Sequence, residues 1–131
     1  MVKQQLGLKI DSLSQELTEA GLTLDMIREA IVKELDLGSI GINETLPLPG
    51  LSLRIRTIKV GLDFATYFQL SFLEEAMLVR NRAMYHATTW SQSSIVACRP
   101  EELKKEVLDT ARLLTQTFAR DYNKAMQPQA K

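Results

Sequence analysis

The feature that most constrains the fold is a long amphipathic segment that begins at Pro100. Apolar residues recur in it every three or four positions, which places them on one face of an α-helix. They are Leu103, Val107, Ala111, Leu114, Phe118 and Tyr122. Pro100 fits the first turn of a helix, because the N–H that proline lacks has no partner there. We therefore expect a C-terminal helix of about six turns, and the rest of the chain must supply the surface that buries its apolar stripe.

The segments before this helix have the pattern of strands. Apolar and polar residues alternate in them, as they do when one face of a strand is buried. The segments are 5–13, 39–43, 51–62, 64–79 and 84–91. The later segments follow one another closely and predict a three-stranded antiparallel meander over residues 51–91. A short irregular passage is expected between this meander and the C-terminal helix.

Two local features of the meander bear on its register. After Ile55 the apolar residues move from odd-numbered to even-numbered positions, which predicts a bulge or a change in which face is covered. The turn between the last two strands is expected at Arg80, Asn81 and Arg82, because asparagine tolerates a positive φ.

A second helix is expected from Leu24 to Asp36. Thr23 is suited to cap its N-terminus, and Gly38 is suited to end it, because glycine enters the left-handed region without steric cost. The apolar residues of this segment share one stripe: Leu24, Ile27, Ile31 and Leu35. The polar passage before it, residues 14–21, is expected to be a connection or a short helical turn.

These elements predict an α+β fold with a single domain, residues 1–131, and a frayed tail at 127–131. We expect a two-layer sandwich, because two amphipathic helices must each bury a stripe. In it, a mostly antiparallel sheet of four to five strands carries two helices on one face, in the order β-α-β-β-β-β-α. The other face of the sheet is left to solvent or to a partner.

Composition disfavours several classes of partner and location. The 16 Lys and Arg balance 16 Asp and Glu, so no net field attracts nucleic acid, and no nucleic-acid partner is expected. No apolar run approaches the ~20 residues of a membrane-spanning helix, so no transmembrane segment is expected. The start, MVKQQLGLKI, lacks the apolar core of a signal peptide. Export therefore requires a leader that has been removed.

Few residues are suited to nucleophilic chemistry. His86 is the only histidine, and a pair with Ser91 or Ser93 can be drawn, but neither serine lies in a nucleophile elbow. Cys98 is the only cysteine, so it makes no intramolecular disulfide. The start of the C-terminal helix could lower its pKa, although a small buried apolar residue is the simpler interpretation.

Motifs for cofactors are also missing from the sequence. No P-loop or GxGxxG spacing is present, and one histidine with one cysteine does not make a usual zinc ligand set. The adjacent acids Glu74 and Glu75 would point to opposite faces of a strand. We therefore expect no cofactor and no metal, and an enzyme is disfavoured.

Five residues are candidates for an interaction surface. Leu46 and Leu48 lie in an apolar segment stiffened by proline, and Arg54 and Arg56 alternate on the uncovered face of a strand. Trp90, the only tryptophan, either fills the core with its N–H bonded to an acceptor or anchors a partner. We expect a protein partner or a homo-oligomer, bound through the open sheet face or edge.

Three short segments resemble a set of small, uncharacterised bacterial proteins that often carry export signals. They are Gly21-Leu22-Thr23 with the helix after it, ATTWSQSSIV at 87–96, and FARDYNKA at 118–125, which is similar to that group's F-x-x-D-Y-x-x-A ending. The resemblance implies no activity and no functional residue. The element order is also similar to that of small periplasmic α+β modules of envelope assembly and transport lipoproteins, and a shared fold does not transfer function.

The patterns and the resemblance together predict a non-enzymatic exported protein that acts through protein contacts in the periplasm or at the envelope. A cytoplasmic location is the alternative to export. One alternative function is binding of a small apolar ligand around Phe64, Phe68, Phe72 and Trp90. Another is an enzyme that uses His86, which predicts a pocket containing its ring.

Overall fold

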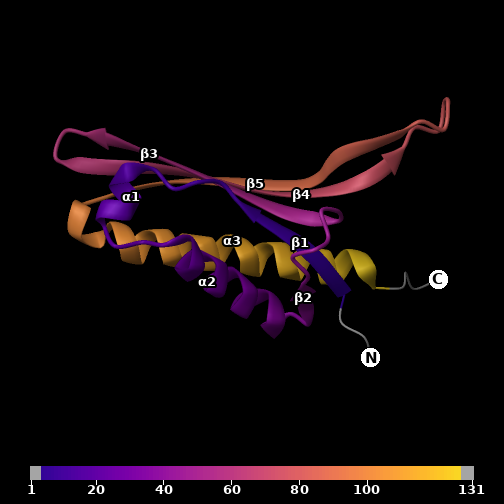
Figure 1. Cartoon of the computed structure of the whole chain (residues 1–131), viewed down its shortest axis with the longest axis horizontal. Helices are drawn as coiled ribbons and strands as arrows, with labels where there is room; N and C mark the ends of the chain where they lie inside the picture. Colours follow the sequence, from indigo (N-terminus) through magenta and orange to yellow (C-terminus); the bar gives the residue numbers. More distant parts are fainter. Residues whose placement is uncertain (1–3, 128–131) are drawn as a thin grey trace.

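The computed structural model describes residues 4–127 and has one five-stranded sheet with helices packed on one face (Figure 1). The α+β class predicted from the sequence is confirmed. The predicted frayed tail at 127–131 lies outside the described residues except for Gln127. In chain order the elements are β1 (Gln4–Ile10), α1 (Gln15–Glu19), α2 (Leu24–Leu37), β2 (Ile40–Ile42), β3 (Gly50–Val60), β4 (Asp63–Met77), β5 (Met84–Cys98), a 3₁₀ turn (Pro100–Glu102) and α3 (Leu103–Met126).

The sheet is mixed, so the prediction of a mostly antiparallel sheet was wrong. The strands lie in the order β2-β1-β3-β4-β5. β1 runs parallel to both of its neighbours, whereas β3, β4 and β5 pair antiparallel as the predicted meander. A parallel pair needs a long crossover, and the helices between β1 and β2 supply it. Alternation of residues is the same in either orientation, so it does not reveal this pairing.

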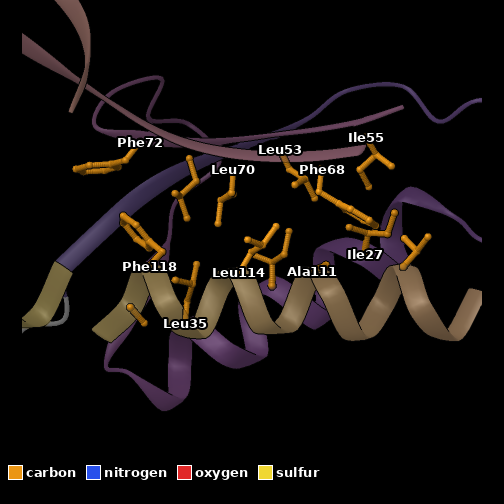
Figure 2. Packing of buried hydrophobic residues seen from close by; sticks show 14 of the residues in the cluster. Ile27, Leu35, Leu53, Ile55, Phe68, Leu70, Phe72, Ala111, Leu114 and Phe118 are labelled. Atoms are coloured by element: carbon orange, nitrogen blue, oxygen red, sulfur yellow. The ribbon is translucent and has the colours of Figure 1, made fainter. Parts of the chain in front are cut away.

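The core lies between the sheet and the helices α2 and α3, which run side by side below it (Figure 1 and Figure 2). Every residue of the predicted C-terminal stripe is buried, with Tyr122 the most exposed at 8%. In α2 the stripe is also buried except for Leu24, which is 44% exposed. Thr23 caps α2 as predicted, because its side chain accepts a hydrogen bond from the Met26 N–H at 3.2 Å. We call the sheet face away from these helices the open face.

The element order differs from the predicted one by the additional helix α1. Its residue Leu17 is fully buried, so the polar passage between β1 and α2 contributes to the core. A second correction concerns β5, which continues to Cys98 where an irregular passage was expected. Pairing with β4 extends along this whole length, as far as Phe64 opposite Cys98.

The apolar shift in β3 reflects a change of covered face and not a bulge. The β3–β4 register is unbroken. Thr57 is buried at the inward position, while Ile58 and Val60 are exposed on the open face. The register shift of the sheet lies instead between Phe72 and Leu73, where β4 pairs with β5.

The turn of the β4–β5 hairpin lies where it was predicted. The Leu78 N–H donates to the Ala83 carbonyl at 2.9 Å, and the Arg82 N–H donates to the Leu78 carbonyl at 2.7 Å. The residue with positive φ in this turn is Arg82, whose φ of 57° lies in the left-handed region. The prediction had placed the positive φ at Asn81, whose side-chain oxygen instead accepts a hydrogen bond from the Ala83 N–H at 3.0 Å.

Candidate functional site

A pocket of about 660 Å³ lies between the β4–β5 hairpin and the loop before β3. Its lining residues are Pro47, Leu48, Pro49, Glu74, Glu75 and His86. Gly7 lets the loop pass this close to β1, because a Cβ there would lie 2.0 Å from the Leu46 carbonyl oxygen. The structure thus brings Leu48, a predicted surface residue, together with two acids and the only histidine.

A second pocket, of about 280 Å³, also reaches Glu74 and lies against the C-terminal part of α3. Its wall is aromatic and includes Phe72, Trp90, Phe118 and Tyr122. The Trp90 and Phe118 rings meet edge to face with centroids 5.1 Å apart, a favourable geometry for aromatic pairs. This pocket offers space to a small apolar group.

Trp90 joins β5 to α3 at the edge of this pocket. Its ring is half-buried, and its Nε1–H donates to Asp121 Oδ2 at 3.0 Å. This hydrogen bond is the main reason that the pKa of Asp121 lies below its ordinary value. The expectation that Trp90 packs between sheet and helix and finds an acceptor for its N–H is confirmed.

Glu74 was set aside in the sequence analysis together with Glu75, yet it lines both pockets. The Thr89 hydroxyl donates to Glu74 Oε2 at 2.5 Å. Thr89 has no register partner on β4, because Phe72 pairs with Trp90 and the next pair is Leu73 with Thr88. This bulge turns Thr89 toward the carboxylate. The residue pattern of the strand does not predict the bulge.

The negative charge of Glu74 also affects the pKa of Tyr122, which lies in the same aromatic pocket. Burial raises the pKa of Tyr122, and the negative charge of Glu74 raises it further. Both effects disfavour the phenolate. Tyr122 is therefore a neutral hydroxyl at physiological pH, available to this pocket as a hydrogen-bonding group.

The remaining predicted surface residues lie elsewhere. Arg54 and Arg56 are exposed on the open face, where their guanidinium groups lie 3.4 Å and 3.9 Å from Asp11 Oδ2. Leu46 is half-buried in the loop before β3. The predicted set is thus divided between this loop, the open face and the boundary between β5 and α3.

The Ser–His pair drawn from the sequence is not formed. Ser91 pairs in register with Ser71, and their hydroxyl oxygens are 3.3 Å apart. Ser91 is separated from His86 by about 16 Å, the length of five residues of strand, and Ser93 is farther along. His86 itself is exposed and pairs in register with Glu75, and it lines the larger pocket as the enzyme hypothesis requires.

Cys98 has the opposite pKa shift to the one considered from the sequence. Burial raises the pKa of its thiol, and the carboxylates of Glu106, Glu102 and Asp63 raise it further. The alternative of a thiol activated by the helix terminus was therefore wrong, because nearby negative charge disfavours the thiolate. Within residues 4–127 no group of three or more His, Cys, Asp and Glu side chains is placed to hold a metal ion.

The free edge of the sheet at β5 is the feature that sequence reasoning could not locate. β5 ends the strand order, and it is 15 residues long. We define the β5 edge as residues 87–98. It contains no Lys, Arg, Asp, Glu or Pro, the residues that usually block pairing at an exposed edge. An edge was expected to bind a partner, but strand order is needed to know which edge it is.

Comparison with known proteins does not identify a family for this chain. No family model matches the chain, and no curated protein matches it. A crystal structure of a minor lipoprotein from Acinetobacter baumannii is 11% identical, with a TM-score of 0.47, and the match covers 100% of this chain and 98% of that chain. A likeness this slight has no bearing on function. No helix in residues 4–127 is long and apolar enough to cross a membrane.

Proposed function

We propose that this protein acts through protein contacts, and that the β5 edge is where a partner adds a strand. The observation that carries the proposal is the length and composition of this edge. An edge strand presents a row of N–H and C=O groups to any extended segment that approaches. The 15 residues of β5 form the longest uncovered edge, because β2 at the opposite end of the sheet has three.

The side chains of the β5 edge could contact a partner strand on both faces of the sheet. Ser91, Ser93 and Ile95 lie on the open face, where Ile95 is 72% exposed. Trp90 and Val96 lie on the other side, partly packed against the core. A partner strand would therefore meet hydroxyl groups on one side and apolar side chains on the other. Backbone bonds provide the affinity in such pairing, and alternate side chains provide the specificity.

Site-specific photo-crosslinking in the source cells tests this proposal. Arg54, Gln69 and Ser93 form one row across β3, β4 and β5, so probes at Arg54 and Ser93 are about 10 Å apart on the same face. A probe at Ser93 should give a discrete protein adduct, and a probe at Arg54 should give little. A third probe at Leu113, exposed on α3, controls for random collision. Equal yields at all positions, or an adduct from Arg54 alone, would contradict the proposal.

We also propose that the protein is exported to the periplasm or envelope. The three segments that resemble exported bacterial proteins support this part. Reading the gene upstream of Val2 and fractionating the source cells test it. A removable leader with recovery in the envelope fraction is expected, whereas a frame without a leader and purely cytosolic recovery would exclude export.

A second candidate function is the binding of a small apolar ligand. The aromatic pocket beside Trp90 favours it, since rings line about 280 Å³ of space. Phe68 is fully buried, so the ligand would sit near the end of α3 and not deep between the layers. Native mass spectrometry of gently purified protein should then detect a bound species that Trp90→Ala loses. A spectrum with protein alone would count against this candidate.

Non-enzymatic action is part of the main proposal, and the alternative is an enzyme that uses His86. The larger pocket, in which His86 lies beside Glu74 and Glu75, is the observation in its favour. Any hydrolytic activity found with purified protein should be lost in His86→Asn if this alternative is correct. Activity that survives His86→Asn would eliminate it.

A further inference from the structure

The β4–β5 hairpin extends past the end of α3 and turns away from the helical layer (Figure 1). We define the hairpin tip as residues 77–85. Its large apolar side chains are exposed to solvent, although a surface turn does not require apolar residues. Their exposed fractions are 53% for Met77, 42% for Leu78, 90% for Val79, 58% for Met84 and 51% for Tyr85.

The charge of the hairpin tip has one sign. Arg80 and Arg82 are its charged residues, and the segment contains no acid. Neither guanidinium forms an ion pair with a carboxylate within residues 4–127. The tip is therefore cationic, although the charges of the chain as a whole balance.

The backbone of the turn also singles out one of these arginines. Arg82 has a φ of 57°, in the left-handed region that glycine and asparagine favour. An arginine at such a position is uncommon, and outliers of this kind are a reason to look for function. Here a charged side chain occupies a position where a smaller residue would fit the backbone better.

We propose that the hairpin tip inserts into the interfacial region of a bilayer that contains anionic phospholipid. Leu78, Val79 and Met84 would enter the boundary of the acyl chains, as apolar residues of peripheral proteins do. Arg80 and Arg82 would extend to the lipid phosphates. Tyr85 would lie at the level of the headgroups, where its ring and hydroxyl both find suitable surroundings.

The opposite end of the sheet provides a comparison within the same molecule. The β3–β4 turn also exposes apolar side chains, with Leu62 87% exposed. Its flanking charges are mixed, since Lys59 is followed by Asp63. Apolar exposure is thus common to both turns, but purely positive charge belongs to the hairpin tip. Charge complementarity therefore favours an anionic lipid surface at this end.

Sedimentation of the purified protein with lipid vesicles tests the proposal. Vesicles of phosphatidylglycerol and phosphatidylethanolamine should bind it, and vesicles of phosphatidylcholine should bind it much more weakly. Val79→Asp should reduce binding by about tenfold, and Leu62→Asp, the matched control, should leave it unchanged. Both positions are exposed, and circular dichroism will verify that each variant is folded.

Neutralising the arginines tests the charge separately. Arg80→Gln combined with Arg82→Asn should weaken binding by about fivefold for each charge removed and should reduce its dependence on salt. Asparagine suits the left-handed φ at position 82, so the turn is expected to persist. Absence of binding to the anionic vesicles, or equal losses in Val79→Asp and Leu62→Asp, would overturn the proposal. Because no protein partner is present in this assay, its failure would leave strand addition at the β5 edge unaffected.

Discussion

Phe118→Ala removes the ring at the centre of the aromatic cluster that joins α3 to the sheet. Phe118 is 1% exposed, and its ring centroid lies 5.2 Å from that of Phe72 and 5.1 Å from that of Trp90. Truncation of a buried phenylalanine to alanine generally costs about 3–5 kcal/mol, through lost burial and the cavity that remains. The sheet and α3 surround this site and limit its collapse, so we expect about 4–5 kcal/mol.

This loss is large relative to the stability of a domain, which is typically about 5–15 kcal/mol. At about 3–5 °C per kcal/mol for a chain of this size, the melting temperature should fall by about 12–25 °C. Urea denaturation measures the free energy of unfolding. Circular dichroism is the better signal, because the only tryptophan, Trp90, contacts the mutated site.

Leu113→Ala is the matched control on the same helix. Its side chain is 63% exposed, so the change should be within about 0.5 kcal/mol. A double-mutant cycle with Phe72→Ala should give a coupling of about 0.5–1.5 kcal/mol for the ring pair. If Phe118→Ala destabilises no more than Leu113→Ala, the helix does not face the sheet as described, and the packing argument is refuted.

Three further predictions concern a close backbone contact and two titratable groups. Gly7→Ala should lower the free energy of unfolding by about 1–3 kcal/mol, because its Cβ would lie 2.0 Å from a loop carbonyl oxygen. Gly41→Ala, with its nearest neighbour at 3.6 Å, should change the melting temperature little. The bond from Trp90 lowers the pKa of Asp121 below 3.8, so its stabilisation is present above that pH and is lost as the pH falls through the lower folded pKa. Asp121→Asn should remove this acid dependence in denaturation curves measured between pH 5 and pH 2. Cys98, with its raised pKa, should react with a thiol reagent at pH 8 more slowly than free cysteine, and an equal or faster rate would contradict this.

The helical part of the fold could be predicted because its signal is local. The stripe that ends at Tyr122 and the cap at Thr23 depend on residues three or four positions apart, so the sequence contains the whole pattern. Parallel pairing of β1 depends on strand order, which alternation does not encode. The second half of β5 was missed because Ser91 to Ser94 lie at a sheet edge, where polar residues pair without an apolar period.

The candidate site was predictable only in part. His86, Trp90 and Leu48 stood out as unusual residues, and the structure places them around the two pockets. Glu74, which lines both, was considered only as a pair with Glu75 and was set aside because adjacent strand residues point to opposite faces. Its position depends on the bulge at Thr89 and on the loop that folds over the sheet, and both arise from tertiary packing.

The central claim is that the β5 edge binds a partner by strand addition. The most direct measurement is amide hydrogen exchange of the assembly isolated from source cells, compared with the protein alone. Amides of residues 87–98 should gain protection on assembly, while those of β3, which is paired on both sides, should change little. Unchanged exchange along β5, or protection gained only elsewhere on the sheet, would contradict the claim.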